Sequence, residues 1–119
     1  MKVETIISIV CNEFNIEPWL IQLKSRKKEI KEPRQICHFF VKEYRPDLTL
    51  DCIGNQIGHK DHATVIHSCN VVNNLMDTER EYRGKINRIE SKLMIEAMRG
   101  VLPKYTMNSY QERKQLILN

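Results

Sequence analysis

The stretch Gly58-His-Lys-Asp-His-Ala-Thr-Val-Ile-His-Ser-Cys69 decides the fold of this 119-residue chain. Gly58 is well suited to stop a preceding helix in the left-handed conformation, and Asp61 is well suited to cap the next one. Two helices joined by three or four residues that include a glycine form a helix-turn-helix. The second helix starts with polar and small residues and continues with apolar ones at helical spacing. This pattern predicts an exposed N-terminal tip on a buried helix body.

The segments on either side of this turn have apolar residues at helical spacing. We expect a short helix from about Thr49 to Ile57, with Leu50, Ile53 and Ile57 directed inward. In the helix that follows Asp61, the predicted core stripe is Val65, Cys69, Val72 and Met76, and the predicted outward face is Ala63, His67, Asn70 and Asn74.

The rest of the sequence also has a helical period, and no segment alternates convincingly as a strand. Further helices are expected at Val3–Phe14, in a short element from Pro18, at Pro33–Arg45, at Thr78–Arg99 and in a short last helix from Ser109. Proline is tolerated in a first turn but does not continue a helix, which sets the start at Pro33 and the stop before Pro46. The Thr78-x-x-Glu81 pattern is typical of a capping box. The predicted fold class is all-α, a helix-turn-helix bundle.

The net charge of +4 is concentrated in one short segment. Between residues 24 and 34, six basic residues stand against two acidic ones, whereas the remaining basic and acidic residues balance. A run of like charges is often simply solvated surface. Beside a helix-turn-helix, however, this concentration favours a polyanionic partner such as DNA.

The helix tip at Asp61 carries residue types that suit a DNA groove. A helix N-terminus attracts phosphate, and the first turn of a recognition helix approaches base edges in the major groove. The predicted major-groove residues are Lys60, Asp61, His62, Ala63 and Thr64. Lysine suits a phosphate or guanine, histidine suits a base acceptor, and small methyl groups suit a thymine methyl. The alternative is that Asp61 only caps the helix and that His62 and Thr64 are simply solvated.

The basic run supplies candidates for the minor groove and for phosphates. Arg26 is the predicted minor-groove residue, because negative potential is concentrated in a narrow A/T-rich groove. Lys24, Lys27 and Lys28 are expected to contact or attract phosphates, and Arg34, Gln35, His38 and Lys42 form a polar strip expected to clamp them. The alternative for this strip is an ordinary solvated helix face.

Other classes of function are disfavoured. His59, His62, His67 and Cys69 superficially suggest a metal site, but His62 and His67 point about 140° apart on one helix and Cys69 belongs to its core stripe. No phosphate-binding loop, zinc-protease motif or nucleophile elbow is present. We therefore expect no metal or other cofactor, no nucleotide and no enzymatic activity.

The four cysteines are spaced singly, and Cys11, Cys37 and Cys69 fall among apolar neighbours. Reduced thiols are therefore expected rather than a disulfide framework. No apolar run approaches the roughly 18 residues that a membrane span requires, and the N-terminus does not resemble a signal peptide. The expected location is the cytoplasm, without a membrane partner.

Two stretches carry a family resemblance: Lys24-Ser-Arg-Lys-Lys-Glu-Ile-Lys-Glu-Pro-Arg-Gln-Ile36 and Ile57-Gly-His-Lys-Asp-His-Ala-Thr-Val-Ile-His-Ser-Cys69. Their basic loop, E-P-R-Q helix start and K-D-H-x-T-V helix closely resemble the C-terminal DNA-binding domain (domain IV) of the bacterial replication initiator DnaA. The likeness runs from about residue 3 to 93. It implies a helical fold related to the Trp repressor and binding to short asymmetric boxes in double-stranded DNA at replication origins.

The resemblance also implies roles for individual positions. Arg26 corresponds to the family's minor-groove arginine, and residues 60–64 correspond to its major-groove contacts. Phosphate-facing positions correspond to Arg34, Gln35, Lys42 and His67. The chain departs from the family pattern at Lys60 (usually arginine), Ala63 (usually threonine) and Asp51 (commonly proline). Because lysine lacks the bidentate fork of arginine, these departures leave the target sequence open.

The predicted domain covers residues 1–94, and residues 95–119 are expected to form a partly helical C-terminal extension. Without the family's ATPase module, a stand-alone homologue is expected to bind DNA and regulate replication initiation without hydrolysing ATP. The extension is expected to pack back onto the domain or to bind a protein partner or a second copy. The alternative function is a helical protein-interaction module that uses this extension and does not bind DNA.

Overall fold

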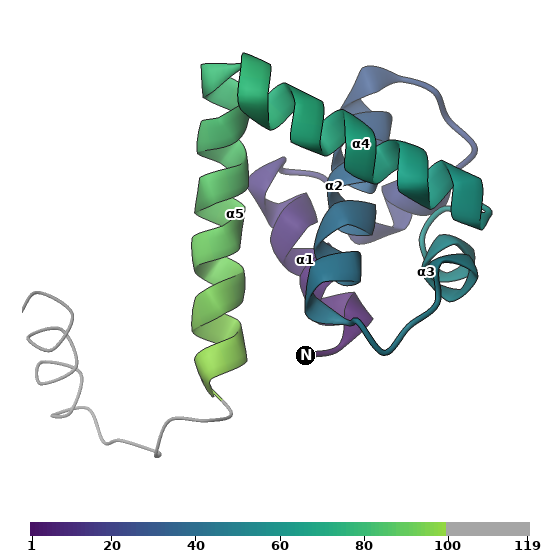
Figure 1. Cartoon of the computed structure of the whole chain (residues 1–119), viewed down its shortest axis with the longest axis horizontal. Coiled ribbons are helices and arrows are strands. Elements are labelled where there is room, and N and C mark those ends of the chain that lie inside the picture. The colour runs from purple at the N-terminus through teal and green to yellow at the C-terminus, as the bar shows by residue number, and fades with distance from the viewer. Residues whose placement is uncertain (100–119) are drawn as a thin grey trace, which may run out of the picture.

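The computed structural model describes residues 1–99, and over this range all the regular structure is helical. The helices are α1 (Val3–Glu13), the 3₁₀ helix η1 (Pro18–Gln22), α2 (Lys28–Tyr44), α3 (Leu50–Gln56), α4 (His62–Thr78) and α5 (Arg80–Arg99) (Figure 1). The predicted all-α class is confirmed, and α3 and α4 form the predicted helix-turn-helix.

The central helix is α2, as its largely apolar circumference predicts. It contacts α1, η1, α3 and α4. The buried hydrophobic residues of these five helices are Val3, Ile6, Ile7, Val10, Cys11, Ile21, Ile36, Cys37, Phe40, Val41, Ile53, Val65, Cys69 and Val72. The stripes predicted for α1 and α4 therefore meet in one core around α2.

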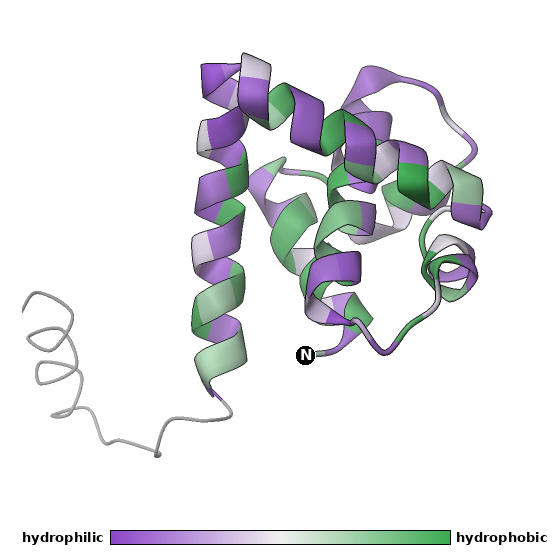
Figure 2. Ribbon diagram, viewed as in Figure 1, coloured by the Kyte–Doolittle hydropathy of each residue, from purple (hydrophilic) through white to green (hydrophobic). Residues whose placement is uncertain are grey.

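The last helix, α5, packs against α1 and α4. Its hydrophobic side faces the bundle (Figure 2) and buries Tyr82, Ile86, Ile89 and Leu93, whereas Ala97, predicted on the same stripe, is exposed. Glu13 of α1 accepts hydrogen bonds from Arg88 Nε at 2.7 Å and from Lys92 Nζ at 2.9 Å, and both contacts lower the pKa of Glu13. These two ion pairs join the outer edge of α5 to α1.

The predicted boundary between residues 94 and 95 falls inside α5, which is continuous to Arg99. The remaining part of the predicted extension, including the helix expected from Ser109 and its packing onto the domain, lies outside the described residues. All four cysteines are free, and three of them are buried. Among residues 1–99, no helix has the length and apolar character needed to cross a bilayer.

One predicted helix start is wrong. α2 begins at Lys28, five residues before the predicted start at Pro33, so part of the basic run is helical and not a loop. Pro33 lies inside the helix, where it removes the N–H that would bond the C=O of Glu29. Because Glu29 is exposed, water can satisfy that carbonyl, and the proline is tolerated.

The capping box predicted at Thr78 is also wrong. Thr78 is the last residue of α4, and its hydroxyl donates to the C=O of Asn74 at 2.9 Å. A threonine that bonds back one turn continues its own helix instead of capping the next. Arg83 Nε donates to the C=O of Met76 at 2.7 Å, which satisfies a carbonyl at the end of α4 and stabilises the sharp turn into α5.

Candidate nucleic-acid interface

The turn between α3 and α4 depends on two residues in the left-handed region, Gly58 with φ 81° and His59 with φ 54°. The N–H of Lys60 then donates to the C=O of Gly54 at 2.8 Å. A Cβ on Gly54 would lie 2.2 Å from the Lys60 carbonyl oxygen, so only glycine allows this approach. The turn is therefore held close to the body of α3.

The start of α4 is capped as predicted. The carboxylate of Asp61 accepts hydrogen bonds from the Thr64 N–H and from the Thr64 hydroxyl, each at 2.9 Å. These contacts lower the pKa of Asp61, because they stabilise its ionised form. The Asp61 carboxylate and the Thr64 hydroxyl are thus already paired within the protein.

Residues 60–64 form the α4 tip, which projects from the bundle. Asp61, His62 and Ala63 are exposed and Lys60 and Thr64 are half-buried, whereas the next residue, Val65, is fully buried. The exposed tip is as predicted, but the body of α4 is buried along one face only: Val65, Ser68, Cys69 and Val72 are buried, whereas Ile66 is 43% exposed. DNA contact by these five residues stays a prediction.

A carboxylate from α3 also reaches the α4 tip. Asp51 Oδ1 accepts a hydrogen bond from the His62 N–H at 3.1 Å and lies 3.2 Å from His62 Nδ1. From the sequence, Asp51 is only a departure from the family pattern. An acidic residue in a first helical turn usually stabilises its own helix, so its reach across the turn depends on tertiary structure.

The connection between η1 and α2, residues 23–27, is the basic arm. Its Lys24, Arg26 and Lys27 are exposed, as is Lys28 at the start of α2. Figure 1 shows this connection and the N-terminus of α4 at the same end of the molecule, away from α5. The structure thus brings the predicted minor-groove and major-groove residues to one side.

Arg34 is not available to clamp a phosphate, so this prediction is wrong. Its side chain is buried, with 4% exposure. Arg34 Nε donates to the C=O of Ile21 at 2.8 Å. Its Nη1 donates to the C=O of Ser25 at 3.1 Å, and its Nη2 donates to the C=O of Leu23. All three nitrogens therefore bind backbone carbonyls at the base of the basic arm.

Gln22 links the same region to the turn. Its Oε1 accepts from the Gly58 N–H at 2.7 Å, and its Nε2 donates to the C=O of Gln56 at 2.9 Å. A Cβ on Gly58 would lie 2.8 Å from Arg34 Cδ, so the turn packs directly on this arginine. We call Gln22, Arg34 and Gly58 the clasp. It fixes the base of the basic arm against the helix-turn-helix.

His38, predicted in the same phosphate-binding strip as Arg34, is a core residue, so this prediction is also wrong. Its side chain is fully buried, with Nε2 2.9 Å from the C=O of Ile57 and Nδ1 2.8 Å from the Ser68 hydroxyl. Because a carbonyl only accepts, Nε2 carries the proton and Nδ1 accepts from Ser68. Burial lowers the pKa of His38 and favours this neutral form. Ser68, polar between buried Val65 and Val72, is the sequence signal that could have indicated this pair.

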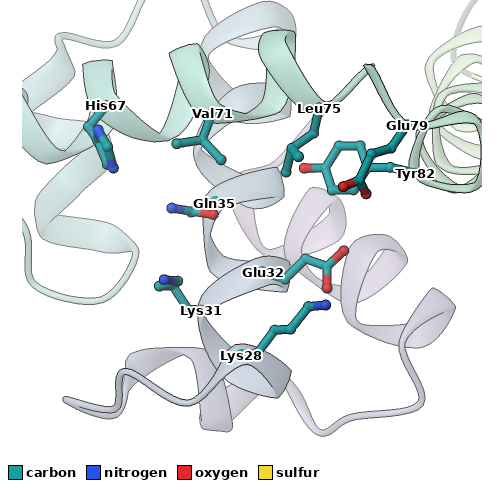
Figure 3. A pocket seen from close by; sticks show the side chains of 9 residues that line it. All are labelled: Lys28, Lys31, Glu32, Gln35, His67, Val71, Leu75, Glu79 and Tyr82. Atoms are coloured by element: carbon teal, nitrogen blue, oxygen red, sulfur yellow. The ribbon is translucent and has the colours of Figure 1, made fainter. Parts of the chain in front are cut away.

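Three predicted phosphate contacts, Lys28, Gln35 and His67, line one groove of about 300 Å³ (Figure 3). The other lining residues are Lys31, Glu32, Val71, Leu75, Glu79 and Tyr82. Figure 3 shows His67, Gln35 and Lys31 toward one end, and the carboxylates of Glu32 and Glu79 toward the other, with Lys28 beside Glu32. The first end has no carboxylate and is therefore better suited to a phosphate than the end where Lys28 lies near Glu32. Lys42 is exposed further along α2.

Together, the α3–α4 turn, the exposed α4 tip and the adjoining basic arm define a helix-turn-helix protein. The family described as "Bacterial dnaA protein helix-turn-helix" matches residues 3–72. The chain belongs to this DnaA C-terminal helix-turn-helix family.

Similar proteins include three chromosomal replication initiator proteins DnaA. The one from Bacteroides thetaiotaomicron is 37% identical over 93 residues, which cover 78% of this chain and 20% of the relative. The one from Flavobacterium psychrophilum is 35% identical over 95 residues (80% and 20%), and the one from a Synechococcus species is 33% identical over 94 residues (79% and 20%). The chain thus spans about a fifth of the length of these relatives.

Proposed function

We propose that this protein binds double-stranded DNA sequence-specifically, with the α4 tip in the major groove and the basic arm at the adjacent minor groove. The observation that carries this proposal is the clasp, which holds an exposed helix tip and an exposed cationic segment side by side. A helix N-terminus suits phosphates and base edges, and a neighbouring arginine suits a narrow minor groove.

The proposed roles follow the exposure of each side chain. Lys60, Asp61, His62, Ala63 and Thr64 face the major groove, Arg26 enters the minor groove, and Lys24, Lys27, Lys28, Gln35, Lys42 and His67 contact phosphates. Because Asp61 and Thr64 already bond each other, their direct share in base reading is limited to the remaining lone pairs and the threonine methyl group. Most direct base contacts then fall to Lys60, His62 and Ala63.

We further propose that the targets resemble origin boxes and that binding regulates replication initiation. The support is the similarity to chromosomal replication initiator proteins over the helix-turn-helix. In this proposal the protein acts by occupying DNA, not by catalysis.

The first test measures how binding to a selected site depends on salt. Sites are selected from a random duplex pool, and affinity is then measured at several salt concentrations. About five neutralised phosphates predict a log–log slope of roughly −4 to −5. The absence of any preferred site, with no salt dependence, would contradict the proposal and favour a protein-interaction module.

Two substitutions separate the proposed roles. Lys42→Ala is expected to weaken binding to selected and random duplexes alike, because a phosphate contact carries no sequence information. His62→Ala is expected to cost roughly 1–3 kcal/mol on the selected site and to relax its sequence preference. Lys2→Ala, which removes an exposed charge at the start of α1, is the matched control and should have little effect. Equal effects of Lys42→Ala and His62→Ala on both DNAs would overturn these roles.

A further inference from the structure

The ring of His62 is held by one group from outside its own helix. His62 is the first residue of α4, and Asp51 is the second residue of α3. Asp51 Oδ1 lies 3.1 Å from the His62 backbone nitrogen and 3.2 Å from Nδ1 of its ring. Both side chains are well exposed, at 61% for His62 and 68% for Asp51. The pair therefore lies on the surface that the proposed function assigns to DNA.

The chemistry of this contact decides where the imidazole proton lies. An ionised carboxylate only accepts hydrogen bonds, so the contact at Nδ1 requires a proton on that nitrogen. In the neutral imidazole the other nitrogen, Nε2, then carries a lone pair and accepts. Among residues 1–99, Asp51 is the one hydrogen-bond partner of this ring, and the hydrogen bonds of the neighbouring Asp61 carboxylate come from Thr64.

The same oxygen also fixes where the ring lies. It accepts from a backbone N–H of the first turn of α4, a group that has no partner within the helix. Asp51 thereby anchors the ring to the helix start and leaves Nε2 free on an exposed side chain. Asp61, the cap of the same helix, makes no such contact with the imidazole.

We propose that Asp51 is a specificity-determining residue that presents His62 Nε2 to the DNA as a hydrogen-bond acceptor. In the major groove, adenine and cytosine offer an exocyclic amine as donor, whereas guanine N7 and O6 and thymine O4 only accept. The base read by His62 is therefore adenine or cytosine, a base donor and not the base acceptor that the residue type alone predicts. This inference rests on the proposed function and deepens it, because it names the class of base that this position selects.

The tautomer is tested in the free protein, without DNA. The ¹⁵N chemical shifts of the His62 ring nitrogens are measured above neutral pH. We expect a protonated Nδ1 and a bare Nε2 in the wild type, and a shift toward the opposite tautomer in Asp51→Ala. Asp77→Ala, which removes an exposed carboxylate near the far end of α4, is the matched control and should change nothing. A wild-type ring protonated at Nε2, or no response to Asp51→Ala, would overturn the proposal.

The base preference is tested on the selected DNA site. The position read by His62 is identified as the base pair at which the His62→Ala protein no longer prefers one base. We expect adenine or cytosine at that position. Replacing the base by its analogue without the exocyclic amine should weaken wild-type binding about fivefold to tenfold. The same replacement should change the affinity of Asp51→Ala or His62→Ala by less than about twofold. Selection of guanine or thymine, or an equal loss in all three proteins, would refute the base assignment.

The two experiments distinguish a failure of the proposed function from a failure of the role proposed for Asp51. A protein that prefers no duplex site refutes the proposed function and with it the base assignment, while the ring shifts still report whether Asp51 sets the tautomer. A protein that binds its site with a ring protonated at Nε2 keeps the proposed function and refutes the role of Asp51.

Discussion

His38 and Arg34 are polar residues of α2 whose hydrogen bonds all lie within the protein. Arg34 donates to three backbone carbonyls, and His38 joins α2 to Ile57 and to Ser68 of α4. A buried polar side chain that loses its partners leaves unsatisfied groups behind, which costs about 1–3 kcal/mol. Both residues therefore act in folding, although their spacing on the helix matches a surface strip.

The burial of His38 predicts a pH-dependent stability. Burial lowers the pKa of His38 below its ordinary value of 6.5, so the unfolded chain binds a proton more readily than the folded one. The contribution of His38 is complete above about pH 6.5 and decreases as the pH falls toward the lowered folded-state pKa. We expect the Tm to fall by a few degrees between about pH 7.5 and pH 5, measured by circular dichroism.

His38→Gln should remove this pH dependence, whereas His59→Gln, at an exposed position, should retain it. Above about pH 5, the titration of Glu13 does not interfere with this measurement. Arg88 and Lys92 lower the pKa of Glu13, so its contribution to stability is lost only at more acidic pH. An unchanged pH dependence in His38→Gln would show that another group carries it.

The helix-turn-helix depends on the close approach of its turn to α3. Gly54 lies under the Lys60 carbonyl, and Gly58 packs on Arg34 of the clasp. These contacts position the α4 tip relative to the basic arm, which is the geometry that the proposed function requires.

The glycines Gly54 of α3 and Gly84 of α5 are expected to respond oppositely to alanine. Gly54→Ala should destabilise the fold by about 2–3 kcal/mol, because the new methyl group meets backbone atoms at 2.2 and 2.8 Å. Gly84→Ala should stabilise it by about 0.5–1 kcal/mol, because the nearest atom is a side-chain nitrogen at 3.5 Å and alanine favours the helix. Urea unfolding measures both, and equal effects would contradict the close approach at Gly54.

The core extends beyond residues 3–72, the range that matches the helix-turn-helix family description. The match covers residues 3–72, yet α5, from residue 80 to 99, buries Ile86, Ile89 and Leu93 against the bundle. Its charged edge pairs with Glu13 of α1. The structure therefore indicates that α5 and the helix-turn-helix form one folding unit.

Leu93→Ala tests this unit. Leu93 is fully buried, so its truncation should lower the free energy of unfolding by about 2–4 kcal/mol. If α5 unfolds together with the bundle, the opening free energy measured by hydrogen exchange at α2 amides should fall by a similar amount. Met94→Ala, at the next and 51% exposed position, is the matched control and should stay within about 0.5 kcal/mol. Unchanged protection of α2 in Leu93→Ala would mean that α5 unfolds separately.

Local sequence determined most of the helices, the stop at Gly58, the cap at Asp61 and the core stripe of α4. These features depend on residues within one or two turns of each other, so spacing and turn chemistry are sufficient to predict them. The exposed tip and the concentration of charge near it were predictable for the same reason. The start of α2 was not, because Pro33 is tolerated inside a helix where Glu29, the residue that loses its hydrogen-bond donor, is exposed.

Only the tertiary structure decided which polar residues are available to a partner. Arg34 binds carbonyls up to 13 residues away, His38 binds a hydroxyl 30 residues away, and Asp51 reaches His62 across 11 residues. A helical pattern shows which side chains share a face, but it does not show what packs against that face. Burial and pairing therefore follow from contacts between helices, and these contacts separate the residues that hold the site from those that can bind DNA.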